Sequence, residues 1–230
     1  MIWGWYGAPG DVVPVSVNFE VMEPPEYLPE LGEVASGEIR NFALSELTSF
    51  ELQPQLSSEM SYLTLFTLGV AEYVAKDWNA TIGLLNAAVE GLDSSNDLDL
   101  SLAFFYEGNA HLFIDSLEAA ITAYDAALNI NPDSHEALNN KGNALYELGQ
   151  YEAAIAAYDA ALALEPNLPF AYGGLAYAYT ALNQKEQAID SLEKFLEISP
   201  DFDRQQLDNI EELEALSNHP RFRAIVDAPQ

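Results

Sequence analysis

Residues 116–133, SLEAAITAYDAALNINPD, and residues 150–167, QYEAAIAAYDAALALEPN, are two copies of one pattern and are identical at 11 of 18 positions. Each copy carries a proline near its end, and Pro132, Pro166 and Pro200 lie 34 residues apart. Because proline lacks the amide hydrogen that continues a helix, each of these residues marks a helix end. The spacing predicts a repeated unit of 34 residues in the second half of the chain.

Small residues recur at fixed places in this repeat, as expected where helices approach one another closely. The columns are Gly108, Gly142 and Ala176, then Ala120, Ala154 and Ala188, with an apolar column of Ile121, Ile155 and Ile189. Each unit holds two stretches with helical periodicity, such as 135–148 and 151–164, separated by a short turn. The unit is therefore predicted to be an αα-hairpin whose small-residue face is covered only when the next hairpin stacks on it. An earlier unit fits with a step of 39 residues, its five extra residues falling within 93–99.

These columns resemble those of the tetratricopeptide repeat, a 34-residue unit with large apolar, Leu-Gly, aromatic, Ala and Pro positions at set offsets. The third unit carries them at Leu138, Gly142, Leu145, Ala154, Tyr158, Ala161 and Pro166. The resemblance implies an all-α solenoid, a superhelix of four αα-hairpins at 62–100, 101–134, 135–168 and 169–202. A polar capping helix over 203–217 and a tail complete the last region, 203–230. Glu107 and Lys141 depart from the family by replacing leucine, and we expect them to pair across adjacent helices.

The first sixty residues fall outside the repeat. Residues 1–30 are predicted to form an extended, apolar, proline-rich arm, and the region 31–61 to hold an N-terminal capping helix over 37–52 that stops before Pro54. Residues 13–21 alternate strictly between apolar and polar, which predicts one β-strand. A lone strand leaves its backbone groups unpaired, so it pairs with another chain, lies in a groove or stays disordered. The arm residues expected to carry self-association are Trp3, Trp5, Val13, Val15, Val17, Phe19 and Val21.

The charge and composition exclude several classes of partner. Eight Lys and Arg against 37 Asp and Glu give a net charge of −29, which repels nucleic acid. No cysteine is present, and no apolar run approaches the roughly 18 to 20 residues of a membrane span. The apolar start at residues 1–7 is typical of the remnant of a leader or anchor. This favours an extracytoplasmic or cell-surface location for a processed chain over a cytoplasmic one.

The sequence offers no catalytic, metal or cofactor motif. It lacks a Gly-rich phosphate loop, and none of its three histidines, which lie in different repeats or the tail, is followed four residues later by a His or Glu. The 37 acidic residues follow helical faces, as a solvated surface does, so we predict that the chain is not an enzyme. Asn79-Ala80-Thr81 is a glycosylation sequon, which matters only if the protein is exported; otherwise it is an ordinary helix start.

The resemblance places ligand contacts on the first helix of each hairpin, in the concave groove of the superhelix. The residues expected there are Phe66, Tyr73, Phe105, Asn109, Phe113, Asn139, Asn143, Tyr146 and Tyr177. No Lys or Arg occupies these positions, so an acidic peptide end is a poor ligand, whereas an extended apolar segment fits. We expect a protein-interaction scaffold without a cofactor, with its own N-terminal arm as a candidate ligand that would assemble subunits into a filament or ring. The alternative is an adaptor for an unrelated protein, with the arm a leftover leader or anchor.

Overall fold

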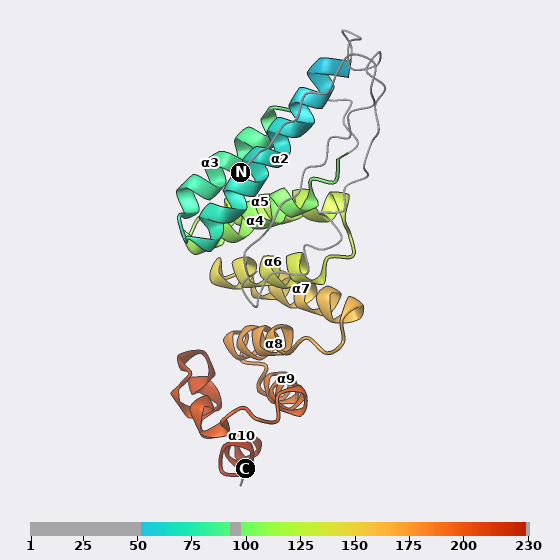
Figure 1. Cartoon of the computed structure of the whole chain (residues 1–230). Coiled ribbons are helices and arrows are strands. Elements are labelled where there is room, and N and C mark those ends of the chain that lie inside the picture. The colour runs from blue at the N-terminus through green and yellow to red at the C-terminus, as the bar shows by residue number, and fades with distance from the viewer. Residues whose placement is uncertain (1–51, 93–97, 229–230) are drawn as a thin grey trace.

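The computed structural model describes residues 52–92 and 98–228, and its regular structure within these ranges is entirely helical (Figure 1), which confirms the predicted all-α class. The elements are α2 (Leu52–Val74), α3 (Trp78–Glu90), α4 (Ser101–Phe113), α5 (Leu117–Ile130), α6 (His135–Glu147), α7 (Tyr151–Leu164), α8 (Pro169–Ala181), α9 (Lys185–Ile198), the 3-10 helices η1 (Arg204–Asn209) and η2 (Glu211–Leu216), and α10 (Pro220–Val226). The predicted arm with its strand, and residues 37–51 of the predicted capping helix, lie outside the described residues.

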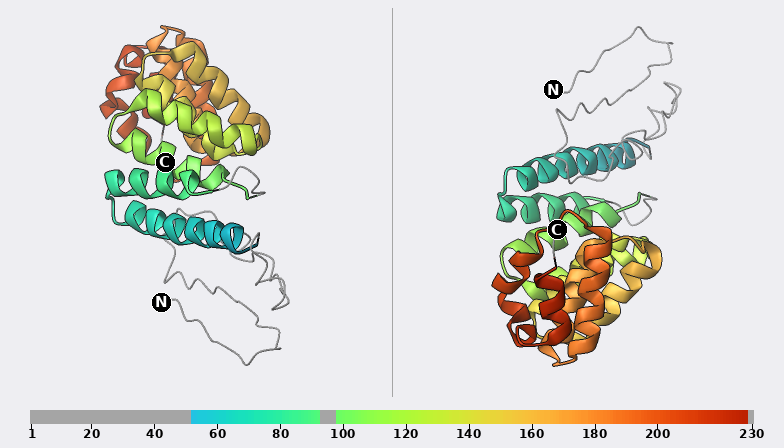
Figure 2. Two further views of the ribbon diagram at one scale, coloured as in Figure 1. Left: turned by 90° about the horizontal axis from the view of Figure 1, so that it is seen from above. Right: turned by 90° about the horizontal axis from the view of Figure 1, so that it is seen from below.

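Eight of these helices form four antiparallel hairpins that stack in chain order. Each hairpin contacts the next through its second helix, as α3 contacts α4, α5 contacts α6 and α7 contacts α8. Figure 1 shows the stack running from α2 and α3 at one end to α10 at the other, and Figure 2 shows the helix axes changing direction along it. The structure is the predicted solenoid of αα-hairpins.

Every hairpin turns through one residue in the left-handed region. These residues are Lys76, Asp115, Gly149 and Asn183, with φ of 64°, 60°, 76° and 57°. At each turn the following amide reaches back five residues, as Gln150 N does to the Leu145 carbonyl at 2.8 Å. This is a Schellman ending, which satisfies the last carbonyls of the first helix and reverses the chain.

The small-residue columns form the seams of the array. Tyr124 and Tyr158, on α5 and α7, are 0% and 1% exposed, and each ring packs closely against a glycine of its own hairpin. A Cβ on Gly108 would lie 2.6 Å from the Tyr124 ring, and a Cβ on Gly142 equally close to the Tyr158 ring. Only glycine permits this approach, which explains the recurrence of small residues in the sequence.

The C-terminal cap differs from the single helix predicted over 203–217. Ile210 is extended, with φ −89° and ψ 114°, and divides the segment into η1 and η2. Leu207, Ile210, Leu213 and Leu216 are spaced by three residues, which matches the three residues per turn of a 3-10 helix and places all four on one side. Leu207, Leu213 and Leu216 are buried with Leu192 and Leu196 of α9.

The tail after Pro220 folds back onto the C-terminal cap. Pro220 stands at the first position of α10, where its missing amide hydrogen costs nothing. Phe222 and Val226 are 1% and 4% exposed and join the same apolar cluster, with Ile225 packed against it. The apolar face of the last hairpin is therefore covered by three short helices, η1, η2 and α10, instead of by one polar helix.

At the other end, α2 begins at Leu52, whereas the sequence placed the start of the first unit at Tyr62. Pro54 lies in the first turn of α2, where the backbone amides have no partner inside the helix, so proline is tolerated there. The helix thus begins beside the proline that was expected to end a preceding one.

Candidate functional site

The first helices of the hairpins form one side of the stack, because α2 contacts α4, α4 contacts α6 and α6 contacts α8. We call this side the first-helix face. All nine predicted contact residues lie on these four helices. Phe113 is exposed; Phe66, Tyr73, Phe105, Asn143, Tyr146 and Tyr177 are half-buried; and Asn109 and Asn139 are buried.

Three aromatic rings gather where the first two hairpins turn. Trp78 stacks on Phe113, with ring centroids 4.4 Å apart and planes 13° apart. Tyr73 meets Trp78 edge to face at 5.3 Å and lies 6.3 Å from Phe113. Phe113 nevertheless keeps 59% of its surface in contact with solvent. We call Tyr73, Trp78 and Phe113 the aromatic patch.

Phe66 and Phe105 lie deeper, between this patch and the core. Phe66 stacks on Tyr62 at 5.8 Å, and both Phe66 and Phe105 contact the buried ring of Tyr106. Their partial exposure leaves an apolar floor beside the aromatic patch. Burial raises the pKa of Tyr106, and its hydroxyl has no hydrogen-bond partner in the described part of the chain.

The predicted asparagines are divided between internal and open roles. Asn109 Oδ1 accepts hydrogen bonds from the Tyr124 hydroxyl at 2.7 Å and from Asn140 Nδ2 at 2.8 Å, so this oxygen is used inside the protein. Asn143 Oδ1 likewise accepts from the Tyr158 hydroxyl at 2.8 Å. Asn139 Nδ2 donates to Asn140 Oδ1 at 3.1 Å, but Asn139 Oδ1 is buried with no partner among the described residues. The amides therefore form a chain that ends in one unpaired acceptor.

A second aromatic group lies toward the other end of the face. Tyr146 is 5.5 Å from Tyr151 and 6.2 Å from Tyr177, with the ring planes tilted by 52° and 45°. Burial first, and then the nearby Glu212 carboxylate, raises the pKa of Tyr146 to about 12. The same two causes raise the pKa of Tyr177. The helix η2, which carries Glu212, packs on α8 and so brings the C-terminal segment beside this face.

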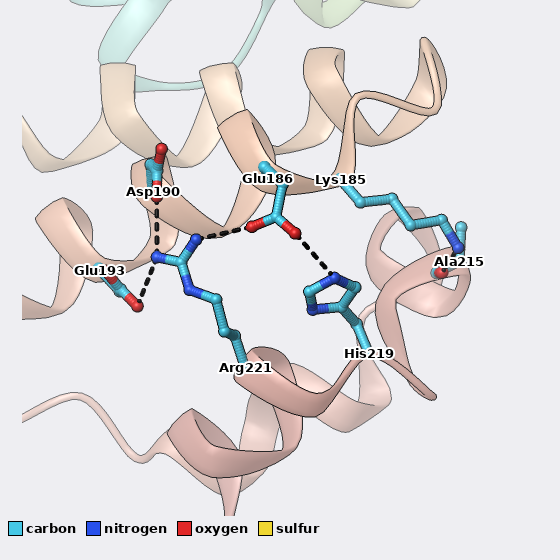
Figure 3. A network of polar contacts seen from close by, with 7 residues as sticks. All are labelled: Lys185, Glu186, Asp190, Glu193, Ala215, His219 and Arg221. Atoms are coloured by element: carbon cyan, nitrogen blue, oxygen red, sulfur yellow. Dashed lines mark hydrogen bonds and ion pairs between the residues drawn. The ribbon is translucent and has the colours of Figure 1, made fainter.

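The cations whose partners are described serve mainly to hold the array together. Arg221 of α10 binds three carboxylates of α9, Glu186 at 2.8 Å, Asp190 at 2.8 Å and Glu193 at 3.0 Å (Figure 3). His219 lies 3.2 Å from the same Glu186, and Lys185 donates to the Ala215 carbonyl (Figure 3). These contacts fasten the cap onto the last hairpin.

The expected pairing of Glu107 with Lys141 is wrong. Lys141 instead binds Asp125 of α5 at 2.5 Å, and Glu107 lies 3.6 Å from His111, one turn along its own helix. Lys141 therefore does pair with the adjacent repeat, but through Asp125 of α5, whereas Glu107 pairs within its own helix. Burial raises the pKa of Glu107, partly countered by His111.

Two residues of these clusters escaped the sequence analysis. Trp78 and Tyr151 each open the second helix of their hairpin, whereas the predicted positions all lie on first helices. Both occupy the same place in the repeat, five residues after Tyr73 and Tyr146 respectively, and this recurrence is the signal that would have found them. Glu212 carries no such signal, because it lies outside the repeats.

The sequon and the remaining chemistry can be placed as well. Asn79 is exposed, whereas the Thr81 hydroxyl is buried and donates to the Asp77 carbonyl at 2.9 Å. Over residues 52–92 and 98–228, no three His, Asp or Glu side chains are grouped to hold a metal ion. No described helix has the length and apolar character needed to cross a membrane.

The comparisons with known proteins agree with this architecture. A tetratricopeptide repeat family model matches residues 105–169 and 141–201. A crystal structure of MamA is 26% identical, with a TM-score of 0.56, over 61% of this chain and 79% of that chain. MamA residues 41 to the end from Desulfovibrio magneticus RS-1 are 19% identical, with a TM-score of 0.58, over 73% of this chain and 94% of that one. YrrB, described as a TPR protein with an unusual peptide-binding site, is 19% identical, with a TM-score of 0.56, over 63% and 71%. No curated protein matches by sequence.

Proposed function

We propose that this chain, in which residues 105–201 match a tetratricopeptide repeat family model, is a non-catalytic scaffold that binds an extended apolar segment of a protein along the first-helix face. The observation that carries the proposal is the aromatic patch. The stacked Trp78–Phe113 pair places an apolar ring in water, because Phe113 is 59% exposed. Such surfaces gain free energy when a partner covers them, and aromatic anchors dominate binding interfaces.

The amide chain beside the patch supports recognition of a peptide backbone. Asn139 Oδ1 is a buried acceptor without a described partner, which costs about 1–3 kcal/mol while it stays unpaired. A backbone N–H of an extended segment would supply the missing donor only if binding exposed this buried oxygen. Asn143, half-buried on the same helix, is the second amide within reach of the face.

A fluorescence titration tests this function. The probe is a synthetic peptide of residues 11–22, DVVPVSVNFEVM, added to a chain that lacks residues 1–22, in which Trp78 is the only tryptophan. We expect a saturable change in Trp78 emission and at least a tenfold weaker affinity in Phe113→Asp. Ile130→Asp is the matched control, because Ile130 is also an exposed apolar residue, 43% exposed, but ends a second helix. No response, or equal weakening in both variants, would contradict the proposal.

We further propose that the arm, residues 1–30, is the ligand of a neighbouring subunit, so that copies assemble head to tail. Its alternating residues 13–21 suit an extended segment, and its apolar side chains suit the aromatic patch. Light scattering on the full chain and on the chain lacking residues 1–22 decides the matter. If the arm drives self-assembly, the full chain should have a mass larger than that of a monomer, whereas the chain lacking residues 1–22 should have the mass of a monomer. Equal masses favour the alternative, an adaptor for an unrelated protein.

A further inference from the structure

The second aromatic group brings three tyrosine rings together, and we call Tyr146, Tyr151 and Tyr177 the tyrosine cage. Tyr146 closes α6, Tyr151 opens α7 and Tyr177 lies on α8, so three helices each contribute one ring. The interplanar tilts of 52° and 45° mean that the rings do not stack face to face on one another. All three side chains are half-buried, which leaves part of each ring accessible.

The charges around this cage are negative. Glu147 follows Tyr146 directly, and Glu212 of η2 lies near enough to Tyr146 and Tyr177 to raise the pKa of both hydroxyls. Both carboxylates are exposed. Three described cations near the cap have partners elsewhere, since Arg221 is held by three carboxylates of α9, Arg223 by Asp208 and Lys185 by the Ala215 carbonyl. Arg204 of η1 forms no ion pair with Glu147 or Glu212. The phenol rings therefore face acidic groups that lack a counter-ion within the described part of the chain.

We propose that Tyr146, Tyr151 and Tyr177, together with Glu147 and Glu212, bind the arginine side chain of a partner protein segment. A cation over the face of a tyrosine ring gains free energy from the ring quadrupole, and more when carboxylates stand beside it. Arginine fits better than lysine because its planar guanidinium stacks on a ring and still donates to a carboxylate in its own plane. This inference rests on the proposed function, and it specifies the chemistry of the ligand at the third and fourth repeats.

The arginine site also constrains the identity of the ligand. Residues 1–30 contain no Lys or Arg, so the chain's own arm has no side chain for the cage. A segment that fills both places carries apolar residues over the aromatic patch and an arginine over the tyrosine cage. The arm can therefore cover the aromatic patch alone, whereas an arginine over the tyrosine cage comes from a partner segment outside residues 1–30, whose approach the net charge of −29 favours.

The test uses the full chain with its tyrosine rings labelled for NMR and N-acetyl-arginine amide as the probe. We expect saturable shifts of the Tyr146 and Tyr177 resonances, which are assigned from the single Tyr→Phe variants. N-acetyl-citrulline amide, which has nearly the same shape without the charge, should leave these resonances unmoved. N-acetyl-lysine amide should bind more weakly than the arginine probe.

Two exposed carboxylates of η2 provide the matched pair of variants. Glu212→Gln should weaken arginine-amide binding about three- to fivefold, in line with one partly exposed charge pair. Glu214→Gln removes the same charge from the same turn and should not weaken it, because Glu214 is not among the groups that act on the tyrosines. Shifts that follow citrulline equally, or equal losses in both variants, overturn the arginine site. If the Trp78 response to the apolar peptide persists in that case, the proposed scaffold function stands without the cage.

Discussion

The first and third repeats place aromatic side chains at the same two positions but surround them with different chemistry. Tyr73 and Trp78 of the first repeat correspond to Tyr146 and Tyr151 of the third. In the first pair of hairpins the third ring is an exposed phenylalanine, whereas in the last pair it is Tyr177, beside Glu147 and Glu212. One backbone arrangement thus presents an apolar patch at one end and an acidic tyrosine cage at the other.

The difference shows how a repeat array separates stability from recognition. The buried columns must repeat, because each hairpin packs on the next in the same way. The solvent-facing positions are free to vary, and here they vary in charge and in hydroxyl content. The predictions below test whether the two regions share a core and differ only at the surface.

The largest effect is expected from the buried tyrosines. Tyr124→Ala and Tyr158→Ala each remove a ring that is at most 1% exposed, and each should lower the free energy of unfolding by about 3–5 kcal/mol. Urea denaturation followed by circular dichroism measures both. Similar losses support a common core. A loss below about 1 kcal/mol in one variant would mean that the two hairpins are held by different contacts.

The next effect concerns the hairpin turns. Gly149→Ala places a side chain at a residue with φ 76° and should lower the free energy of unfolding by about 1 kcal/mol. No atom lies within 4 Å of the new Cβ, so the only cost is the strained backbone. Asp115, in the preceding hairpin, has φ 60°, so Asp115→Gly relieves the same strain and should raise the free energy of unfolding. The gain should be less than about 1 kcal/mol, because glycine also increases the conformational entropy of the unfolded chain. Thermal melts of the pair check both signs. A lower melting temperature for Gly149→Ala and a higher one for Asp115→Gly would confirm that the two turns carry the same backbone strain.

The 34-residue period predicted the repeated hairpins because a large side chain of the second helix packs on a small residue of the first at a fixed offset, as Tyr124 does on Gly108 and Tyr158 on Gly142. Interactions that do not recur could not be found this way. The leucine spacing of three residues is typical of the 3-10 geometry of η2, but it does not indicate that η2 packs on α8 and brings Glu212 to the first-helix face. The position of Trp78 against Phe113 depends on how two hairpins stack, and no pattern within one hairpin specifies it.

A smaller, local effect is expected at the C-terminal end. Arg221→Ala removes one partner from Glu186, Asp190 and Glu193, and these exposed contacts are weakened by salt. Hydrogen exchange should become faster in α10, and raising the ionic strength should reduce the difference from the original chain. The amides of α4 and α5 serve as the internal control. Faster exchange there would show that the cap stabilises the whole array and not only its last hairpin.

The smallest effect compares Glu107 with Lys141, which occupy the same column in adjacent repeats. Burial raises the pKa of the Glu107 carboxyl above its ordinary value of 4.5, so the folded chain holds this proton more tightly than the unfolded chain does. The stabilising contribution is fully present below pH 4.5 and is lost as the pH rises through the raised value. Glu107→Gln should therefore match the original chain in acid and become the more stable of the two toward neutral pH, as measured by urea denaturation at several pH values. Lys141→Gln tests the contrast, because loss of the contact with Asp125 gives no gain at neutral pH. If Glu107→Gln is instead less stable than the original chain at neutral pH, the interaction of Glu107 with His111 outweighs the cost of burying the carboxylate.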